Sequence, residues 1–238
     1  MLRAPRDGSS TYMKRHKYLF EKDQSDLGST FLHYKECYVN NFSVSAQSAA
    51  LLTGSFDFMG TSSAMASATL GTTDLRSASS FNGLNSVDHV HHAILNGKAL
   101  HGGLDDTNTA YIQGFDFAVA NNLRGAKAIG HLGAVDILAG QLGVTGNINI
   151  FFEGTTFYDY FIADQEMELS LCVMNDNADG FPEGYVFTFP RMVLSSDSMS
   201  AGGLDQDLIE NMAWTALFDD TSGTSVQIDR FRATYTLD

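Results

Sequence analysis

Four segments of this chain alternate apolar and short polar residues with a period of two. They span residues 41–46, 55–58, 115–119 and 142–152. In the first, Phe42 and Val44 alternate with Ser43 and Ser45. Because successive side chains of a β-strand point to opposite faces, each segment predicts a strand with one apolar and one polar face. A sheet built from such strands packs one face against a core and leaves the other wet.

The rest of the chain also favours short strands joined by tight turns. It contains 22 Gly but only 3 Pro, and Gly supplies the positive φ angles that such turns need. Apolar runs bounded by turn residues predict strands at 37–46, 52–60, 111–119, 135–138, 142–152, 168–174, 185–189, 192–196, 210–218 and 226–235. The sequence therefore predicts a mainly β protein, a β-sandwich or partial barrel.

One helix is expected next to this sheet. Thr155 or Thr156 can cap it, and Phe157, Tyr160 and Phe161 lie at spacings that put aromatic rings on one helical face. About two to three turns are expected, ending near residue 164.

The predicted domain organisation has two parts. Residues 1–30 are polar and form an N-terminal arm with one short strand at most, and residues 31–238 form a single β domain. That domain carries a long loop insertion at about 61–110, with a weak helical pattern at 87–95. Because so long a segment without clear elements is usually functional or mobile, this insertion is a candidate contact region.

The charge excludes several classes of partner. The net charge is −14 at pH 7, and binding to phosphates or anionic lipids depends on Lys and Arg. The N-terminal residues lack the apolar run of a secretory signal, and no segment has the apolar length of a membrane span. The sequence predicts a protein made in the cytoplasm that binds neither membranes nor nucleic acid by charge.

The side chains that form active sites or metal sites occur in weak patterns only. Asp88, His89, His91 and His92, with His101, form the one metal-capable cluster, but their spacing is not the i, i+4 geometry of a zinc helix. The string NDNADG at 175–180 lacks the Glu that a calcium loop has at its twelfth position. Cys37 and Cys172 are expected to be buried thiols. We expect no enzyme activity and no cofactor.

Three strings of the sequence are similar to the phage tail tube protein family. They are ECYVNNFSVSAQSAALLTGSFDFMG at 36–60, VANNLRGAKAIGHLGAVDILAGQLGVTGNINIFFEGTTFYDYFIADQEMELSLCV at 119–173 and YVFTFPRMVL at 185–194. The resemblance spans about residues 35–235, apart from the segment 61–110. It implies a structural protein of the virion tail.

The resemblance also implies how such a chain assembles. Six copies would join edge to edge in a ring whose sheets close into one barrel around a lumen, and stacked rings would form the tube that conducts the genome. The implied partners are other copies of the chain, the tape measure protein, the tail terminator and the tail tip proteins, with viral DNA as passing cargo. The arm and the segment 61–110 are candidates for contacts between rings.

The polar face of the alternating strands is then the candidate functional surface. It carries almost none of the long Lys or Glu side chains that free surfaces have, and short polar groups suit a pore lining. The hypothesis is that nine side chains face the lumen: Asn41, Ser43, Ser45, Ser55, Asp57, Asp116, Thr145, Asn147 and Asn149. Only two of them are acidic, so most of the net charge lies elsewhere.

Two other interpretations remain open at the level of sequence. A carbohydrate-binding or adhesin-like β-sandwich would use an exposed Trp or Tyr, and Trp214 is the sole Trp. A secretion-tube or head-completion protein of related fold would differ in how far it polymerises.

Overall fold

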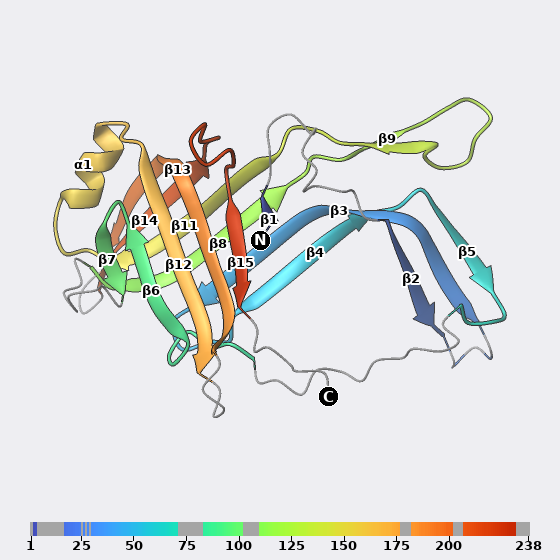
Figure 1. Ribbon diagram of the computed structural model, residues 1–238, viewed down its shortest axis with the longest axis horizontal. Coiled ribbons are helices and arrows are strands. Elements are labelled where there is room, and N and C mark those ends of the chain that lie inside the picture. Colours follow the sequence, from blue (N-terminus) through green and yellow to red (C-terminus); the bar gives the residue numbers. More distant parts are fainter. Residues whose placement is uncertain are drawn as a thin grey trace.

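The computed structural model describes residues 2–3, 17–24, 26, 28, 30–70, 83–101, 110–176, 182–201 and 207–231. These residues form a mainly β structure with one short helix (Figure 1). The elements are β1 Leu2–Arg3, β2 Tyr18–Asp23, β3 Phe31–Gln47, β4 Thr53–Met59, β5 Ser62–Ala66, β6 Val90–Leu95, β7 Lys98–His101, β8 Ile112–Ala120, β9 Arg124–Ala126, β10 Asp136–Leu138, β11 Gly143–Phe151, α1 Thr156–Ile162, β12 Met167–Asp176, β13 Pro182–Ala201, β14 Leu208–Ala216 and β15 Gln227–Phe231.

One layer of the fold is an antiparallel sheet in the order β4-β3-β8-β11-β14-β13. Its strands contain the alternating segments of the sequence. The second layer has the order β15-β13-β12-β6-β7. The two layers make the expected sandwich, and the single chain does not close into a barrel.

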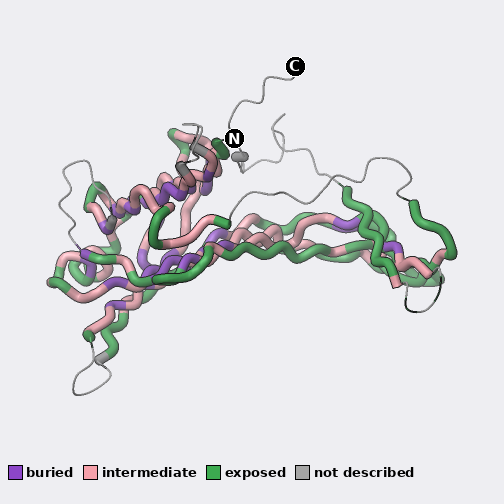
Figure 2. The backbone as a smooth tube through the Cα atoms, turned by 90° about the horizontal axis from the view of Figure 1, so that it is seen from below, coloured by how far each residue is buried: buried purple, intermediate pink, exposed green. Residues whose placement is uncertain are grey.

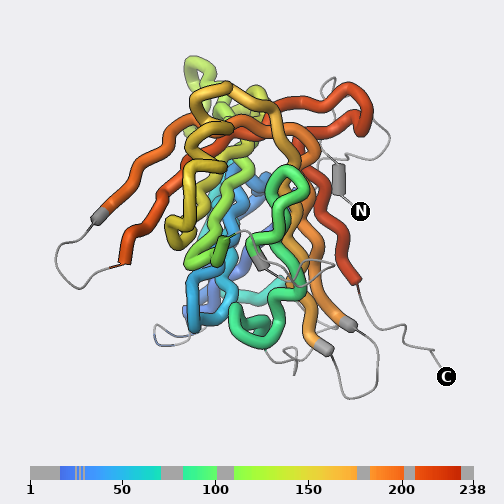
Figure 3. The backbone as a smooth tube through the Cα atoms, turned by 90° about the vertical axis from the view of Figure 1, so that its left-hand side faces the viewer, coloured from blue at the N-terminus to red at the C-terminus, as the bar shows by residue number. Residues whose placement is uncertain are grey.

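Strand β13 belongs to both layers. It is 20 residues long; its first half pairs with β12 and β15, and its second half pairs with β14. The register shifts between Leu194 and Ser196, and a strand that changes sheets needs such an irregularity. Figure 3 shows β13, in orange, rising from one layer and crossing to the other.

The core lies between the two layers and is largely aromatic. Trp214 stacks on Phe115 with ring centroids 6.2 Å apart and meets Phe189 edge-on at 4.7 Å. Phe117 contacts Phe187 and Phe189 at 5.1 and 5.2 Å. These rings join β8 and β14 of one layer to β13 of the other, so the layers share one core.

Gly146 is needed where β11 passes over this core. A Cβ there would collide with the carbonyl oxygen of Asp116 and with the indole ring of Trp214. Because backbone is among the colliding atoms, the neighbours cannot move aside at low cost.

A single-layered extension continues beyond the sandwich. It contains the first half of β3, which pairs with β2 and β5, the hairpin of β9 and β10, and the edge strand β4, which extends past the second layer. Figure 2 shows this region as a thin layer of mainly exposed residues that the second layer does not cover.

Most strand predictions and the helix prediction are confirmed. Every predicted strand has a counterpart, and α1 begins at Thr156 with Phe157 as its buried residue. Thr155 is the N-cap residue, but its side chain makes no capping hydrogen bond; its hydroxyl donates to Asp159 instead, at 3.2 Å.

Three expectations are wrong in the described part of the chain. The N-terminal arm, expected to hold one strand at most, contributes two, β1 and β2. The segment 61–110 is not one long loop, because it contributes β5, β6 and β7. The helical pattern at 87–95 is a strand in the structure, because β6 pairs with β12 and buries Ala93 and Leu95. Tertiary pairing overrides a weak local preference.

The division into an arm and a domain stays a prediction. No helix among the described residues is long and apolar enough to cross a membrane.

Candidate functional site

The strand registers bring all nine predicted lumen residues onto one face of the large sheet. Ser43 of β3 lies opposite Ser55 of β4, and Ser45 lies opposite Asp116 of β8. Asp116 in turn lies opposite Asn147 of β11. Directly opposed residues of antiparallel strands share a face, so these side chains form one continuous polar surface.

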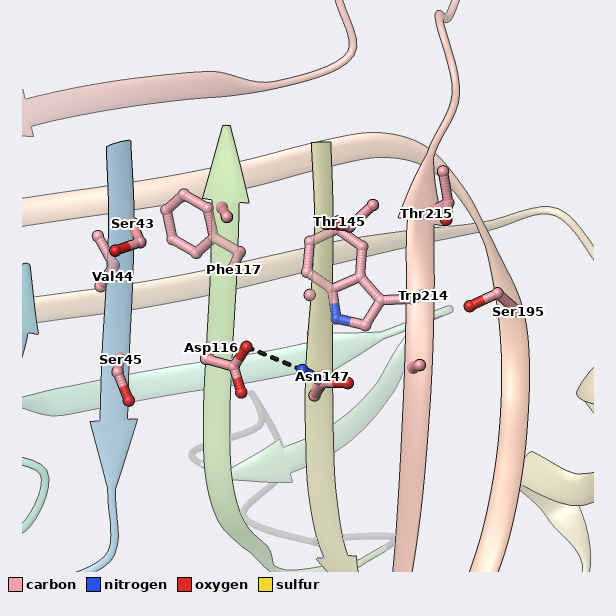
Figure 4. Close-up of a pocket in the computed structure, with 13 residues that line it drawn as sticks. Ser43, Val44, Ser45, Asp116, Phe117, Thr145, Asn147, Ser195, Trp214 and Thr215 are labelled. Atoms are coloured by element: carbon pink, nitrogen blue, oxygen red, sulfur yellow. Dashed lines mark hydrogen bonds between the residues drawn. The ribbon is translucent and has the colours of Figure 1, made fainter. Parts of the chain in front are cut away.

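Hydrogen bonds run across this polar face from strand to strand. Asn41 Nδ2 donates to Asp57 at 3.3 Å, and the hydroxyls of Ser43 and Ser55 are 2.7 Å apart. Asn147 Nδ2 donates to Asp116 at 3.0 Å, and Figure 4 shows this bond between β11 and β8, with Ser45 on the neighbouring strand β3. Each bond links neighbouring strands, so the short polar groups are held in place rather than free to rotate.

Burial separates the two faces of this sheet clearly. None of the nine polar residues is buried, whereas Phe115, Phe117 and Ile148, which alternate with them, are at most 1% exposed. The apolar face of β4 differs, because Phe56 is 56% exposed. The expectation that the apolar face packs a core is therefore wrong for β4 within one chain, since β4 extends past the second layer.

The polar face is wider than the sequence indicated. Across β14 and the second half of β13, the same registers add Asn211, Ala213, Thr215, Ser196 and Ser198. A signal for these residues exists, since Asn211, Ala213 and Thr215 alternate with Met212 and Trp214. The prediction for 210–218 rests on its apolar residues alone.

Both ends of this six-stranded face have strand edges without a partner in the described part of the chain. Strand β4 pairs with β3 alone, and residues 195–201 of β13 pair with β14 alone. Such edges present unpaired N–H and C=O groups that can accept a strand from another chain.

A pair of buried carboxyl groups lies behind the polar face. Glu210, on the core side of β14, is 0% exposed, and its carboxyl group lies beside that of Asp197 on β13. Burial, with the neighbouring carboxyl of Asp197, raises the pKa of Glu210 to about 8. Burial also raises the pKa of Asp197. Glu210 is thus uncharged over much of the neutral range, which suits its place in the core.

The histidines of the candidate metal cluster are engaged in separate contacts. His91 Nε2 lies 3.1 Å from the carbonyl oxygen of Met174, and His92 Nε2 lies 3.3 Å from the hydroxyl of Ser170. His89 Nδ1 accepts a hydrogen bond from the backbone N–H of Asn85 at 2.9 Å. Among the described residues there is no group of three potential metal ligands. The string at 175–180 lies mostly outside the described residues.

The two cysteines and the single tryptophan have structural places. Cys37 and Cys172 are buried free thiols, and burial raises the pKa of each. Trp214 is 1% exposed inside the core, so it offers no platform for a sugar. The sole Trp therefore gives no support to a carbohydrate-binding module.

The fold and the site thus describe a structural β-protein with a wide polar sheet face and unpaired strand edges. Residues 1–216 match the model of the phage tail tube protein family, which is more than half of the chain. The chain therefore belongs to the phage tail tube protein family, a structural class that assembles into the tube of the virion tail. The match includes the N-terminal residues and the segment 61–110, which the resemblance of short strings did not cover. No curated protein matches the chain.

Proposed function

We propose that six copies of this chain close into a ring and that the polar face of the large sheet lines its channel. Stacked rings then form the tail tube, through which the genome passes into the host. The observation that carries the proposal is the continuous polar face that ends at two unpaired strand edges. Pairing of β4 with β13 of the next copy would extend this face around the ring and cover both edges.

The chemistry of the polar face suits a conduit for DNA. Within the registers that define the face, Asp57 and Asp116 are its charged residues, and no Lys or Arg occurs there. Since phosphate binding depends on Lys and Arg, DNA finds no attractive sites on such a wall. Short side chains also leave the channel open.

Electron microscopy of the purified protein tests the assembly. The expected result, across protein and salt concentrations, is rings and hollow filaments of uniform width. A chain that stays monomeric at every concentration would contradict the proposal, and binding on a glycan array would favour the adhesin-like module instead.

Charge reversal on the polar face tests the lumen assignment. Asp57→Lys with Asp116→Lys adds cations to the wall, so we expect tubes that assemble but retain DNA and release it slowly. Asp220→Lys, at an exposed position outside this face, is the matched control. Unchanged genome delivery by particles that carry the double variant would refute the lumen assignment.

Contacts between rings are assigned to the N-terminal arm and the segment 61–110. Deletion of residues 1–22 is expected to leave soluble subunits or rings and to abolish long tubes. The tape measure protein would lie inside the tube, and the tail terminator and tail tip proteins would bind at its ends. Undiminished polymerisation of the deletion variant would refute the role of the arm.

A further inference from the structure

The β9–β10 hairpin is the most exposed apolar feature of the described chain. Ile129 and Leu132, in the turn between the two strands, are 107% and 100% exposed. Two large apolar side chains in full contact with water gain by burial against a partner. Arg124 and Lys127 are exposed beside them, and neither has an ion-pair partner within the described residues.

The base of this hairpin is anchored. Asn121 Nδ2 donates to the carbonyl oxygen of Val39 at 2.9 Å, and the N–H of Leu123 donates to Asn40 Oδ1 at 2.9 Å. Gly133 lies so close to the carbonyl oxygen of Thr61 that a Cβ would approach it to 2.8 Å. The turn is therefore presented on a fixed support, which lowers the entropy cost of binding.

The opposite end of the molecule carries a surface of matching character. Helix α1 lies at the far end of the long axis from β9 (Figure 1). Tyr158 and Ile162, four residues apart on one helical face, are 38% and 65% exposed. Asp159, on the neighbouring position of the helix, and Glu153, just before it, are exposed as well.

We infer that the β9–β10 hairpin of one copy docks on the α1 end of the next copy. The apolar turn then covers Tyr158 and Ile162, while Arg124 and Lys127 meet the acidic residues around α1. This inference rests on the proposed ring and tube, and it names the contact that joins neighbouring subunits in addition to the strand edges.

The positions of the two surfaces favour this occupant. A patch at one end that fits a different patch at the other end makes a head-to-tail contact, which generates rings or filaments instead of closed dimers. Charge complementarity favours this direction of the contact, since the hairpin carries Arg124 and Lys127 against one exposed acid, Asp136, whereas Glu153 and Asp159 lie at the helix. A second copy of this chain provides both the matching apolar patch and the opposite charge.

Ile129→Asp with Leu132→Asp tests the hairpin. Because both side chains are fully exposed, the subunit should keep its circular dichroism spectrum and melting temperature. The protein concentration needed for assembly should rise at least about tenfold, since each contact loses two buried apolar side chains. Phe231→Asp, at an exposed apolar position of β15 outside both surfaces, is the matched control and should assemble like the wild type.

A cysteine pair tests which surface receives the hairpin. The native Cys37 and Cys172 are buried, so Ile129→Cys with Ile162→Cys provides the accessible thiols. Oxidation of the assembled double variant should give a ladder of disulfide-linked multimers on a non-reducing gel. A mixture of the two single variants should give one dimer band, because each chain has a thiol at one end only.

The outcomes separate the inference from the proposed function. If the wild type and the Ile129→Asp, Leu132→Asp variant form tubes equally well, or if assembled double-cysteine protein gives no ladder, the inference is wrong and the tube remains. If the wild type never assembles, both fail together. If the Ile129→Asp, Leu132→Asp variant loses assembly and the double-cysteine variant gives the ladder, the inference and the proposed function are both supported.

Discussion

The sandwich body and the single-layered extension belong to the same sheet, but the apolar faces of their strands are buried to different extents. Phe117 in the body is 1% exposed, whereas Phe56 in the extension is 56% exposed. Both rings contact Phe42, at centroid distances of 5.9 and 4.7 Å. The difference is the second layer, which covers the body and ends before it reaches β4.

This difference assigns separate tasks to the two regions. The body buries its aromatic core within one chain, and two packed layers around one core are the usual architecture of a stable domain. A sheet of a few strands with both faces in water is marginal. A groove of about 570 Å³ between the layers, lined by Phe42, Phe56, Phe187 and Ile228 among others, marks where the second layer ends. The proposed tube would complete the extension with other copies of the chain.

The largest effect is expected from a core truncation in the body. Phe117→Ala removes a buried ring that contacts Phe187 and Phe189, so we expect a loss of about 3–5 kcal/mol in the free energy of unfolding. Urea denaturation of the monomer measures it. A loss below about 1 kcal/mol would mean that the core does not depend on this ring.

A pH-dependent effect is expected from Glu210, also in the body. Its pKa in the folded protein, about 8, lies above its ordinary value of 4.5. The unfolded chain therefore loses this proton first as the pH rises, and stability falls between about pH 4.5 and pH 8. Melting temperatures across this range test the prediction. Glu210→Gln, which stays neutral, should flatten the dependence; an unchanged slope would contradict it.

A smaller effect on the isolated subunit is expected from the matched truncation in the extension. Phe56→Ala removes the same ring from an exposed position, so the free energy of unfolding should change by less than about 1 kcal/mol. Tube formation should weaken, because neighbouring copies lose an apolar contact. A loss of stability equal to that of Phe117→Ala would abolish the distinction between the two regions.

The smallest effect is expected from a surface ion pair of the body. Arg191 pairs with Glu166 and also donates from Nη1 to the carbonyl oxygen of Phe218, at 3.0 Å. Exposed ion pairs are screened by water and salt, so Glu166→Gln should change the melting temperature little and less still at high salt. A large, salt-independent loss would show that this pair holds β13 in place.

Much of the polar face was predictable because its signal is local. The alternation in β3, β4, β8 and β11 assigned the polar residues to one side of each strand, and the registers then joined them. The alternation at Asn211, Ala213 and Thr215 is a weaker signal, because Ala213 is not polar and the segment reads as an apolar run around Met212 and Trp214. Strand β6 was not predicted because it depends on pairing with β12, 70 or more residues away in the chain, and β7 pairs only with β6.

The sequence by itself determined the strand periods, the turn residues, the position of α1 and the side of each strand that is polar. These follow from residues that are neighbours along the chain, so a short window contains the whole signal. Only the tertiary structure decided that β13 joins the two layers, that Glu210 and Asp197 meet in the core, and that Phe56 and Ile129 are left uncovered. Those outcomes depend on which distant strands pair and on where a layer ends. A short stretch of sequence contains no information on either.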